Sequence, residues 1–499
     1  MFSPELNQWQ KNGSQVSGAN RPDLGLLESG LIASTLIRPI GYQKGAPLAA
    51  SSVREHELCN LSRLCSSNMT TSMKRSSRFH TLRFHTLRLA LVVCAGGAAQ
   101  AGPEPSETTP PAPAYHIYAG TTHSHTMFTW SHGAQWGEAK PADGVSETKQ
   151  RGLNVIDGVS HAPKDRVLKP DWQRLQGPPS AHYALARANG YDFYVTTDHS
   201  QEAALHPTSP TNAAWVATQR EAAAATDTAF VALAGFEHSE NNGPNGTGHL
   251  NVINSAWYLN ALEKGIDLPY LYRWLKTVPP NGEGPVVATF NHPGAHQYND
   301  WAYRDAEVTD IITMLEVINS NKYKQGHYEG FVTALDKGWK VSPVAGHDNH
   351  GFGGIKQHAS RTFVLATNKT KAAILDAMKH RRTYAALDKN IQCRYTVNGQ
   401  IMGSTLKSPT VFNFRISISD PDTGNPKDEI TKIDIVKDGG QVVRTFKPAP
   451  AHAVEWDPTI NDSSNKYFFV RVWSAGGGDT PEATPDIPVA WLAPTWTGR

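Results

Sequence analysis

Short apolar runs alternate with amphipathic stretches along the chain from residue 115 to about residue 386. The runs are rich in β-branched and aromatic side chains, which is typical of buried strands. We predict strands at residues 115–119, 191–196, 229–234, 286–290, 311–317 and 341–345. We predict helices at residues 179–190, 211–227, 268–277, 328–337 and 371–382. Ser180 is a possible cap and Gly190 a possible stop of the first helix, and Thr370 is a possible cap of the last. This alternation predicts an α/β fold.

Histidines and carboxylates follow these strands in chain order. His123 and His125 come directly after the first strand, and residues i and i+2 of an extended chain point to the same side. Their imidazoles therefore converge, as metal binding requires. The other candidates near the ends of later strands are His199, Glu237, His249, His292, Asp348 and His350. His132, in a predicted loop, is either a ligand or an ordinary loop histidine.

The position of these residues favours a barrel. Polar residues past the C-terminal ends of successive strands are typical of α/β barrels, whose loops at one rim build the site. An open doubly wound sheet would instead place its ligands at one switch point.

Composition supports a metal site and argues against nucleic acid as a partner. Of the 21 histidines, 16 lie between residues 115 and 360. The formal net charge is only +2, so no strong attraction to a polyanion is expected. Histidine with a few carboxylates suits zinc, manganese or iron, whereas calcium would require more oxygen ligands.

The N-terminal region predicts export. Met73 opens a basic stretch, an apolar run follows at residues 89–99, and Ala99 and Ala101 give a signal-peptidase pattern. We predict a signal peptide at residues 73–101, cleaved after Ala101, and a periplasmic or secreted protein. The apolar run of about 11 residues is too short for a membrane span, which needs roughly 20. A lipoprotein cysteine at Cys94 is disfavoured because Val93 precedes it.

The segments on either side of this signal carry no predicted chemistry. Residues 1–72 are a mis-called or disordered leader, and residues 102–114 are a linker rich in proline and threonine. Of the four cysteines only Cys393 would remain after cleavage, so no internal disulfide is expected.

The composition changes after about residue 394. Alternating strands separated by turns are predicted at residues 411–418, 430–436, 441–446 and 467–473. They predict a small β-sandwich over residues 394–499. Its role is either a structural cap on the barrel or binding of a substrate or surface.

The order of the motifs between residues 115 and 386 resembles the PHP (polymerase and histidinol phosphatase) superfamily. The motifs are H-x-H, T-D-H, G-x-E, N-H-P and D-x-H. The resemblance implies a distorted (β/α)7 barrel over residues 115–390 with two or three divalent metal ions (Zn, Mn or Fe). The signal peptide and the β-rich tail look most like an extracytoplasmic branch that contains carbaryl-hydrolase-type proteins.

The resemblance also implies a ligand assignment. A first metal would be held by His123, His125, Glu237 and Asp348. A second would be held by His199 and His350, and His132 is a less certain match for this site. A third would be held by Glu237, His249 and His292. Two departures matter: Thr121 stands where the family often has Asp, and His347 stands where it usually has Ser. His347 is therefore expected to contact the ligands from outside.

The expected chemistry is ester hydrolysis. A metal-bound hydroxide would attack phosphorus or an acyl carbon. Asp198 would orient His199 or take the proton, unless it caps a helix, and His296 is a candidate general acid. His238 should point away from the site, and Glu316 is more a packing residue than a ligand.

These expectations favour an exported phosphoesterase acting on a small-molecule ester. The first alternative is a carboxylic or carbamate ester hydrolase that uses the same site. The second is a non-catalytic binding protein, which the nearly complete ligand set disfavours. The substrate, the metal and the oligomeric state stay open.

Overall fold

The computed structural model describes residues 114–138, 154–163, 166–240 and 248–499. The described residues all belong to the unit Pro103–Arg499. The predicted leader, the signal peptide and nearly all of the linker lie outside the described residues. Within them, no helix is long and apolar enough to cross a membrane.

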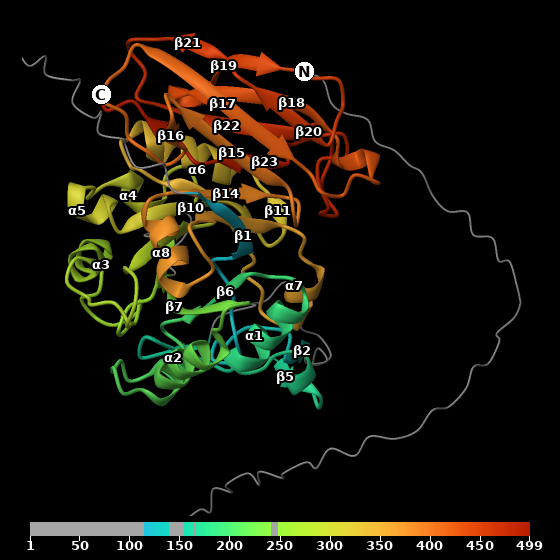
Figure 1. The fold of residues 1–499 in the computed structure, drawn as a ribbon. Helices are drawn as coiled ribbons and strands as arrows, with labels where there is room; N and C mark the ends of the chain where they lie inside the picture. Colours follow the sequence, from blue (N-terminus) through green and yellow to red (C-terminus); the bar gives the residue numbers. More distant parts are fainter. Residues whose placement is uncertain (1–113, 139–153, 164–165, 241–247) are drawn as a thin grey trace, which may run out of the picture. The chain divides into compact units, whose positions relative to one another are not determined.

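Parallel strands form the centre of the α/β part (Figure 1). They are β1 (His116–Thr121), β6 (Phe193–His199), β7 (Val231–Glu240), β9 (Val287–Asn291), β10 (Ile312–Asn319) and β12 (Ser342–Gly346). Each covers or overlaps a run that the apolar pattern predicts as a strand. β8 (Gly248–Ile253) was not predicted and lies antiparallel between β7 and β9. It brings His249 to the edge where the parallel strands end.

The predicted closed (β/α)7 barrel is not confirmed, because the sheet stays open. β13 (Arg361–Ala366) and β14 (Thr383–Ala386) are antiparallel strands that continue the sheet beyond β1. Both edges of β1 and of β13 are therefore occupied, and none is left for β12, which pairs with β10. Side chains bridge the gap instead: Thr362 Oγ1 accepts from Ala345 N at 2.8 Å, and Thr383 Oγ1 donates to Ser342 Oγ at 2.7 Å.

The strands nevertheless gather around one core. Inward side chains of β6, β7, β9, β10, β12 and β13 meet residues of α8 (Lys371–Lys379) in one buried cluster. Ile374, Leu375 and Met378 of this helix are fully buried there. The predicted cap is observed, since Thr370 Oγ1 accepts from Ala373 N.

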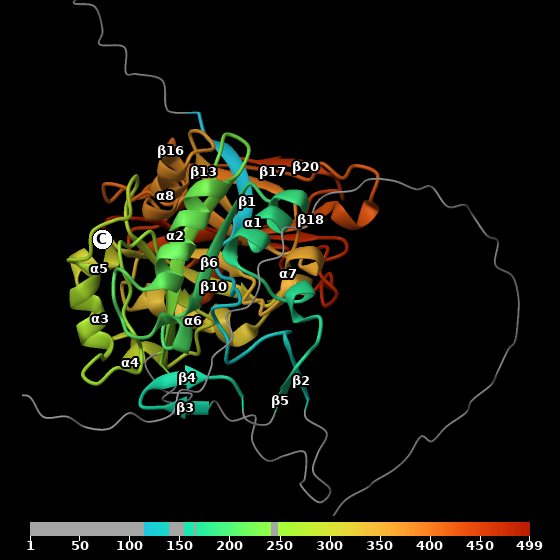
Figure 2. The ribbon, with the colours of Figure 1, turned by 90° about the horizontal axis from the view of Figure 1, so that it is seen from below.

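The other helices lie on the outside of the strands (Figure 2). They are α1 (Pro179–Ala188), α2 (Ala213–Ala225), α3 (Leu268–Leu275), α4 (Gln297–Trp301), α5 (Ala306–Thr309), α6 (Gln325–Asp336) and α7 (Phe352–Gln357). α1 starts with proline at its first position and not with a Ser180 cap. It ends before Gly190, whose φ of +78° suits glycine as the predicted stop.

The β-rich tail is a two-sheet arrangement that shares one sheet with the α/β part. The shared sheet continues from β14 through β23 (Ala490–Leu492), β22 (Tyr467–Ser474), β18 (Ile430–Lys437) and β19 (Gln441–Phe446). The second sheet contains β15 (Gln392–Val397), β16 (Gln400–Ile401), β17 (Val411–Ser419), β20 (Ala453–Trp456) and β21 (Thr459–Asn461). Side chains of both sheets form one core, which includes the free thiol Cys393. Figure 1 shows β14 and β23 between the two parts, so the sheet crosses the predicted domain boundary at residues 390–394.

Short strands complete the described fold. They are β2 (Trp136–Glu138), β3 (Asn154–Ile156), β4 (Val159–His161), β5 (Arg166–Leu168), β11 (Lys322–Tyr323) and β24 (Thr495–Trp496). β11 forms a tight hairpin with β10 at the edge of the sheet that carries the polar cluster.

Candidate metal centre

The predicted ligands gather at one edge of the sheet. His199 ends β6, Glu237 lies on β7, His249 begins the antiparallel strand β8, and His292 follows β9. The loop after β12 reaches the same place, because His347 N and Asp348 N both donate to His123 O at 3.1 Å. The predicted H-x-H pair and the D-x-H motif are thus held side by side by the backbone.

His123 and His125 point their Nε2 atoms at each other across 3.1 Å, and both side chains are fully buried. Asp348 Oδ1 lies 3.0 Å from Nε2 of His125 and 3.5 Å from Nε2 of His123. Three donor atoms so close together form a set that could hold a metal ion.

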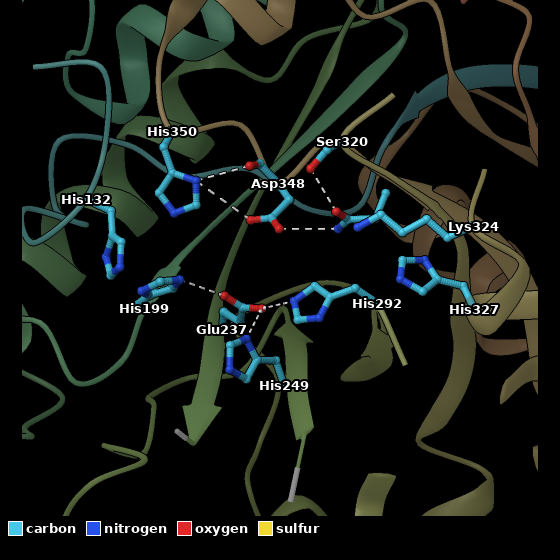
Figure 3. Close-up of a pocket in the computed structure, with 11 residues that line it drawn as sticks. His132, His199, Glu237, His249, His292, Ser320, Lys324, His327, Asp348 and His350 are labelled. Carbon is cyan, nitrogen blue, oxygen red and sulfur yellow. Dashed lines mark hydrogen bonds and ion pairs between the residues drawn. The ribbon is translucent and has the colours of Figure 1, made fainter. Parts of the chain in front are cut away.

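Glu237 is the carboxylate at the middle of the cluster. It is fully buried, and Asn291 Nδ2 donates to its Oε1 at 2.8 Å. Imidazole nitrogens surround it at 3.3 Å (His123), 3.6 Å (His125), 3.0 Å (His199), 3.3 Å (His249) and 3.5 Å (His292). Figure 3 shows three of these rings directed at the carboxylate from different strands.

Further donor sets adjoin this centre. Glu237, His249 and His292 form one, and His125, His199 and His350 form another. His132 forms a set with His199 and Glu202, a carboxylate that the sequence analysis missed. All nine predicted ligands therefore take part in at least one set that could hold an ion.

Two buried atoms show that the cluster fits a metal. Among the described residues, His350 Nε2 has no hydrogen-bond partner. Glu237 Oε2 is also without a hydrogen bond, and its close neighbours are the imidazole nitrogens of His125 and His199. Buried polar atoms are rarely left without partners unless a ligand supplies one. Nitrogen and carboxylate donors without cysteine suit zinc, manganese or iron.

The buried carboxylates raise the pKa values of two histidines in the cluster. Burial would lower the pKa of His123, but Glu237, Glu316 and Asp348 outweigh it and raise the pKa well above its usual value. Burial likewise opposes protonation of His199, yet Glu202 and Glu237 raise its pKa to about 10. Both rings are thus protonated at neutral pH when no metal is bound. Metal binding must displace these protons, so metal affinity should increase with pH.

The neighbouring histidines lower the pKa values of Glu237 and Asp348. Burial favours the neutral form of Glu237, but His123 and His249 lower its pKa well below the usual range. The pKa of Asp348 is likewise lowered by His123 and His125 against the effect of burial. Both groups therefore stay ionised and available to a cation.

Glu316 is a positioning residue on β10 that the sequence analysis weighed mainly as packing. Its Oε1 lies 2.8 Å from His123 Nδ1, and its Oε2 accepts from His292 N at 2.7 Å and from Asn319 Nδ2 at 3.0 Å. It thereby directs Nε2 of His123 into the cluster and fixes the backbone of a second candidate ligand.

We expect Glu316→Gln to weaken metal binding by about 10- to 100-fold, because the amide cannot reproduce all of these acceptor contacts. Competition with a metal-binding dye measures this change. Glu329→Gln, at an exposed position of α6, is the control. An unchanged affinity in Glu316→Gln would show that His123 needs no such support.

Asp198 contacts the loop at residues 126–129, next to His199. Its Oδ1 accepts from the backbone N of Thr126 and of Thr129, at 2.7 and 3.0 Å, and both threonine hydroxyls also donate to the carboxylate. Among the described residues, the Asp198 carboxylate thus accepts from the 126–129 loop and not from the His199 ring. Thr129 in turn accepts from His199 N at 3.1 Å. Asp198 therefore positions His199 through the loop.

His132 stands at the margin of the centre. Its Nδ1 is 2.7 Å from Ser131 Oγ and 3.9 Å from Glu202 Oε1. Glu202 is completely buried, accepts from Ser131 N at 2.9 Å, and forms a short hydrogen bond with the Ser131 hydroxyl. Burial raises the pKa of Glu202, but its contacts with His132 and His199 outweigh this and lower it. A carboxylate that contacts two histidines gave no signal in the sequence beyond its place three residues after His199.

The predicted general acid His296 lies outside the cluster. Its side chain is 77% exposed and faces Asp300 at 3.5 Å, and it is absent from the cavity lining. His238 is buried beside Glu237 and takes part in none of the donor sets described above. His347 is also buried and binds Ser360 O through Nε2 at 2.9 Å, so it supports the loop that carries Asp348.

The centre opens into a cavity of about 420 Å³. Its lining includes seven candidate ligands and residues that the sequence analysis did not identify (Figure 3). The unpredicted residues are Asn319, Ser320, Lys324 and His327. Trp301, which follows the N-H-P motif in the chain, is buried in the main core and does not line the cavity.

No protein-family model and no curated protein matches the sequence. Among solved structures, the chain is similar to a two-domain protein from Bacteroides vulgatus that contains a predicted PHP-like metal-dependent phosphoesterase. The two chains are 17% identical, the match covers 79% of this chain and 100% of the other, and the TM-score is 0.37.

Proposed function

We propose that this protein is a metal-dependent hydrolase of phosphate esters. The observation that carries the proposal is Glu237, a buried carboxylate with imidazole nitrogens of five histidines within 3.6 Å, at the wall of an open cavity. Divalent ions held by these donors would activate a water molecule and stabilise the negative charge that develops on the ester.

The protein's own residues prepare the site for an anionic substrate. Glu237 and Asp348 are the acidic residues in the cavity lining. Divalent ions at this centre and the ammonium of Lys324 on the cavity wall would attract an anionic phosphate ester more strongly than a neutral ester. Glu316 and Asn291 hold His123 and Glu237 in place before substrate arrives, as efficient catalysis requires.

We also propose membership of the PHP superfamily, supported by the order of the ligand motifs along the chain.

The sequence pattern at residues 73–101 supports export to the periplasm or beyond. An N-terminus at Gly102 in the mature protein, read by mass spectrometry, is the expected result. An intact N-terminus in the cytoplasmic fraction would contradict export.

Metal analysis and substrate turnover together test the proposed function. We expect at least two metal ions per chain in the purified protein and turnover of p-nitrophenyl phosphate that falls at least tenfold on chelation and returns on metal addition. Turnover of p-nitrophenyl acetate alone would favour the carboxylic or carbamate ester hydrolase. Less than one ion per chain after loading with zinc or manganese would contradict a metallohydrolase and favour a binding protein.

A further inference from the structure

One wall of the cavity comes from an element that supplies none of the candidate metal ligands. Ser320, Lys324 and His327 line the cavity from the β10–β11 turn and the start of α6, and we call them the β11–α6 wall. Figure 3 shows Lys324 and His327 beside His292, on the opposite side of the cavity from His132.

Lys324 brings a positive charge to the cavity that no ion pair with the described residues neutralises. Its side chain forms no ion pair or hydrogen bond with any of the described residues, although it lies on the cavity wall. Lys322, two residues earlier, behaves differently, because its Nζ lies 2.5 Å from Glu482. The free ammonium of Lys324 is therefore available to an anion in the cavity.

His327 adds a buried polar atom that lacks a partner. Its side chain is 7% exposed, and Nδ1 has no hydrogen-bond partner among the residues that the structure describes. Buried polar atoms are rarely left without a hydrogen-bond partner. A ligand oxygen or a water held by the ligand would satisfy it.

The wall is held rigidly against the metal centre. Asn319 pairs with Lys322, so Ser320 and Asn321 form a two-residue turn in which both φ angles are positive. Asn321 Oδ1 accepts from Ala359 N and Ser360 N at 3.0 and 2.9 Å. Ser320 N donates to Gly346 O, next to the loop that carries Asp348.

We propose that Lys324, assisted by His327, binds a phosphate oxygen that the metal centre does not hold, so that the protein prefers phosphate monoesters to diesters. The inference rests on the proposed function. A monoester has three non-bridging oxygens and a second negative charge, whereas a diester has two such oxygens and one charge. Lys324 would therefore act on the affinity for the dianion more than on the chemical step.

Substrates of decreasing charge test this role in the metal-loaded full chain. We expect Lys324→Met to raise KM for p-nitrophenyl phosphate about tenfold, with kcat within about threefold of the original. KM for bis-p-nitrophenyl phosphate should change less than about threefold, and turnover of p-nitrophenyl acetate should not change. Lys324→Arg should restore most of the monoester affinity. Lys322→Met is the matched control and should leave all three substrates unaffected.

Two results would overturn the role of Lys324 while the proposed function stands. One is an unchanged monoester KM in Lys324→Met, and the other is an equal loss with all three substrates, which would indicate a structural effect. A metal-loaded original protein that turns over neither phosphate ester would overturn the proposed function itself and this inference with it.

Discussion

Glu237→Gln is expected to abolish turnover, with a loss of more than about 10³-fold, and to reduce the metal content of the protein. The substitution keeps the size of the side chain and removes its charge. That charge lies within 3.6 Å of imidazole nitrogens of five histidines, in a completely buried position. The carboxamide has only one oxygen atom that can coordinate a metal, so it cannot coordinate two ions through separate oxygens.

The measurement is metal content per chain together with phosphate ester turnover after reloading with zinc or manganese. Glu307→Gln, whose side chain is 77% exposed, controls for the chemical change alone. Circular dichroism separates loss of the site from loss of the fold. A Glu237→Gln protein that keeps its metal content and more than about a tenth of its activity would show that this carboxylate is not central.

Most of the strands and the candidate ligands could be predicted from the sequence. Buried parallel strands read as continuous apolar runs, which is why β6, β9 and β12 were predicted within one or two residues of their observed starts. The ligands were found because histidine is uncommon and repeated past successive strand ends. His123, His125 and Asp348 indeed meet in space, although 223 residues separate the last two.

Whether the sheet closes could not be predicted from the sequence. The pattern of apolar and polar residues predicts where strands lie, but not which strands pair with each other. β8, β13 and β14 carry apolar residues like the other strands, but their antiparallel direction follows from the chain's path. β13 occupies the edge of β1 that a closed barrel would offer to β12. Thr362 and Thr383, whose hydroxyls bridge that gap, look like ordinary strand residues in the sequence.

The contacts of polar residues that support the site could not be predicted for a similar reason. Glu316 lies inside an apolar strand, and only its contact with His123 distinguishes it from a packing residue. Lys324 and His327 lie on a helix start that carries no motif, and the cavity alone connects them to His292. Asp198 was singled out by its neighbour His199, yet its hydrogen bonds go to Thr126 and Thr129.

Gly346→Ala is expected to lower phosphate ester turnover by about 10²-fold or more while leaving the protein folded. Gly346 ends β12 with an ordinary backbone conformation, so alanine meets no conformational barrier. A Cβ atom there would lie 1.7 Å from Glu316 Oε1 and 3.0 Å from His123 Cβ. The Glu316 carboxylate must therefore move, and His123 loses the acceptor that orients it.

The clash involves the end of a side chain and no backbone atom, so we expect the fold to survive with a thermal midpoint lower by roughly 2–4 °C. Gly294→Ala is the matched control near His292, because its Cβ would meet its nearest neighbour at an ordinary 3.7 Å. Adding Glu316→Ser to Gly346→Ala removes the obstruction and should restore the thermal midpoint but not the activity. If this double variant regained activity, the carboxylate of Glu316 would be unnecessary, and the loss in Gly346→Ala would have to arise from obstruction of the site by the displaced Glu316 side chain.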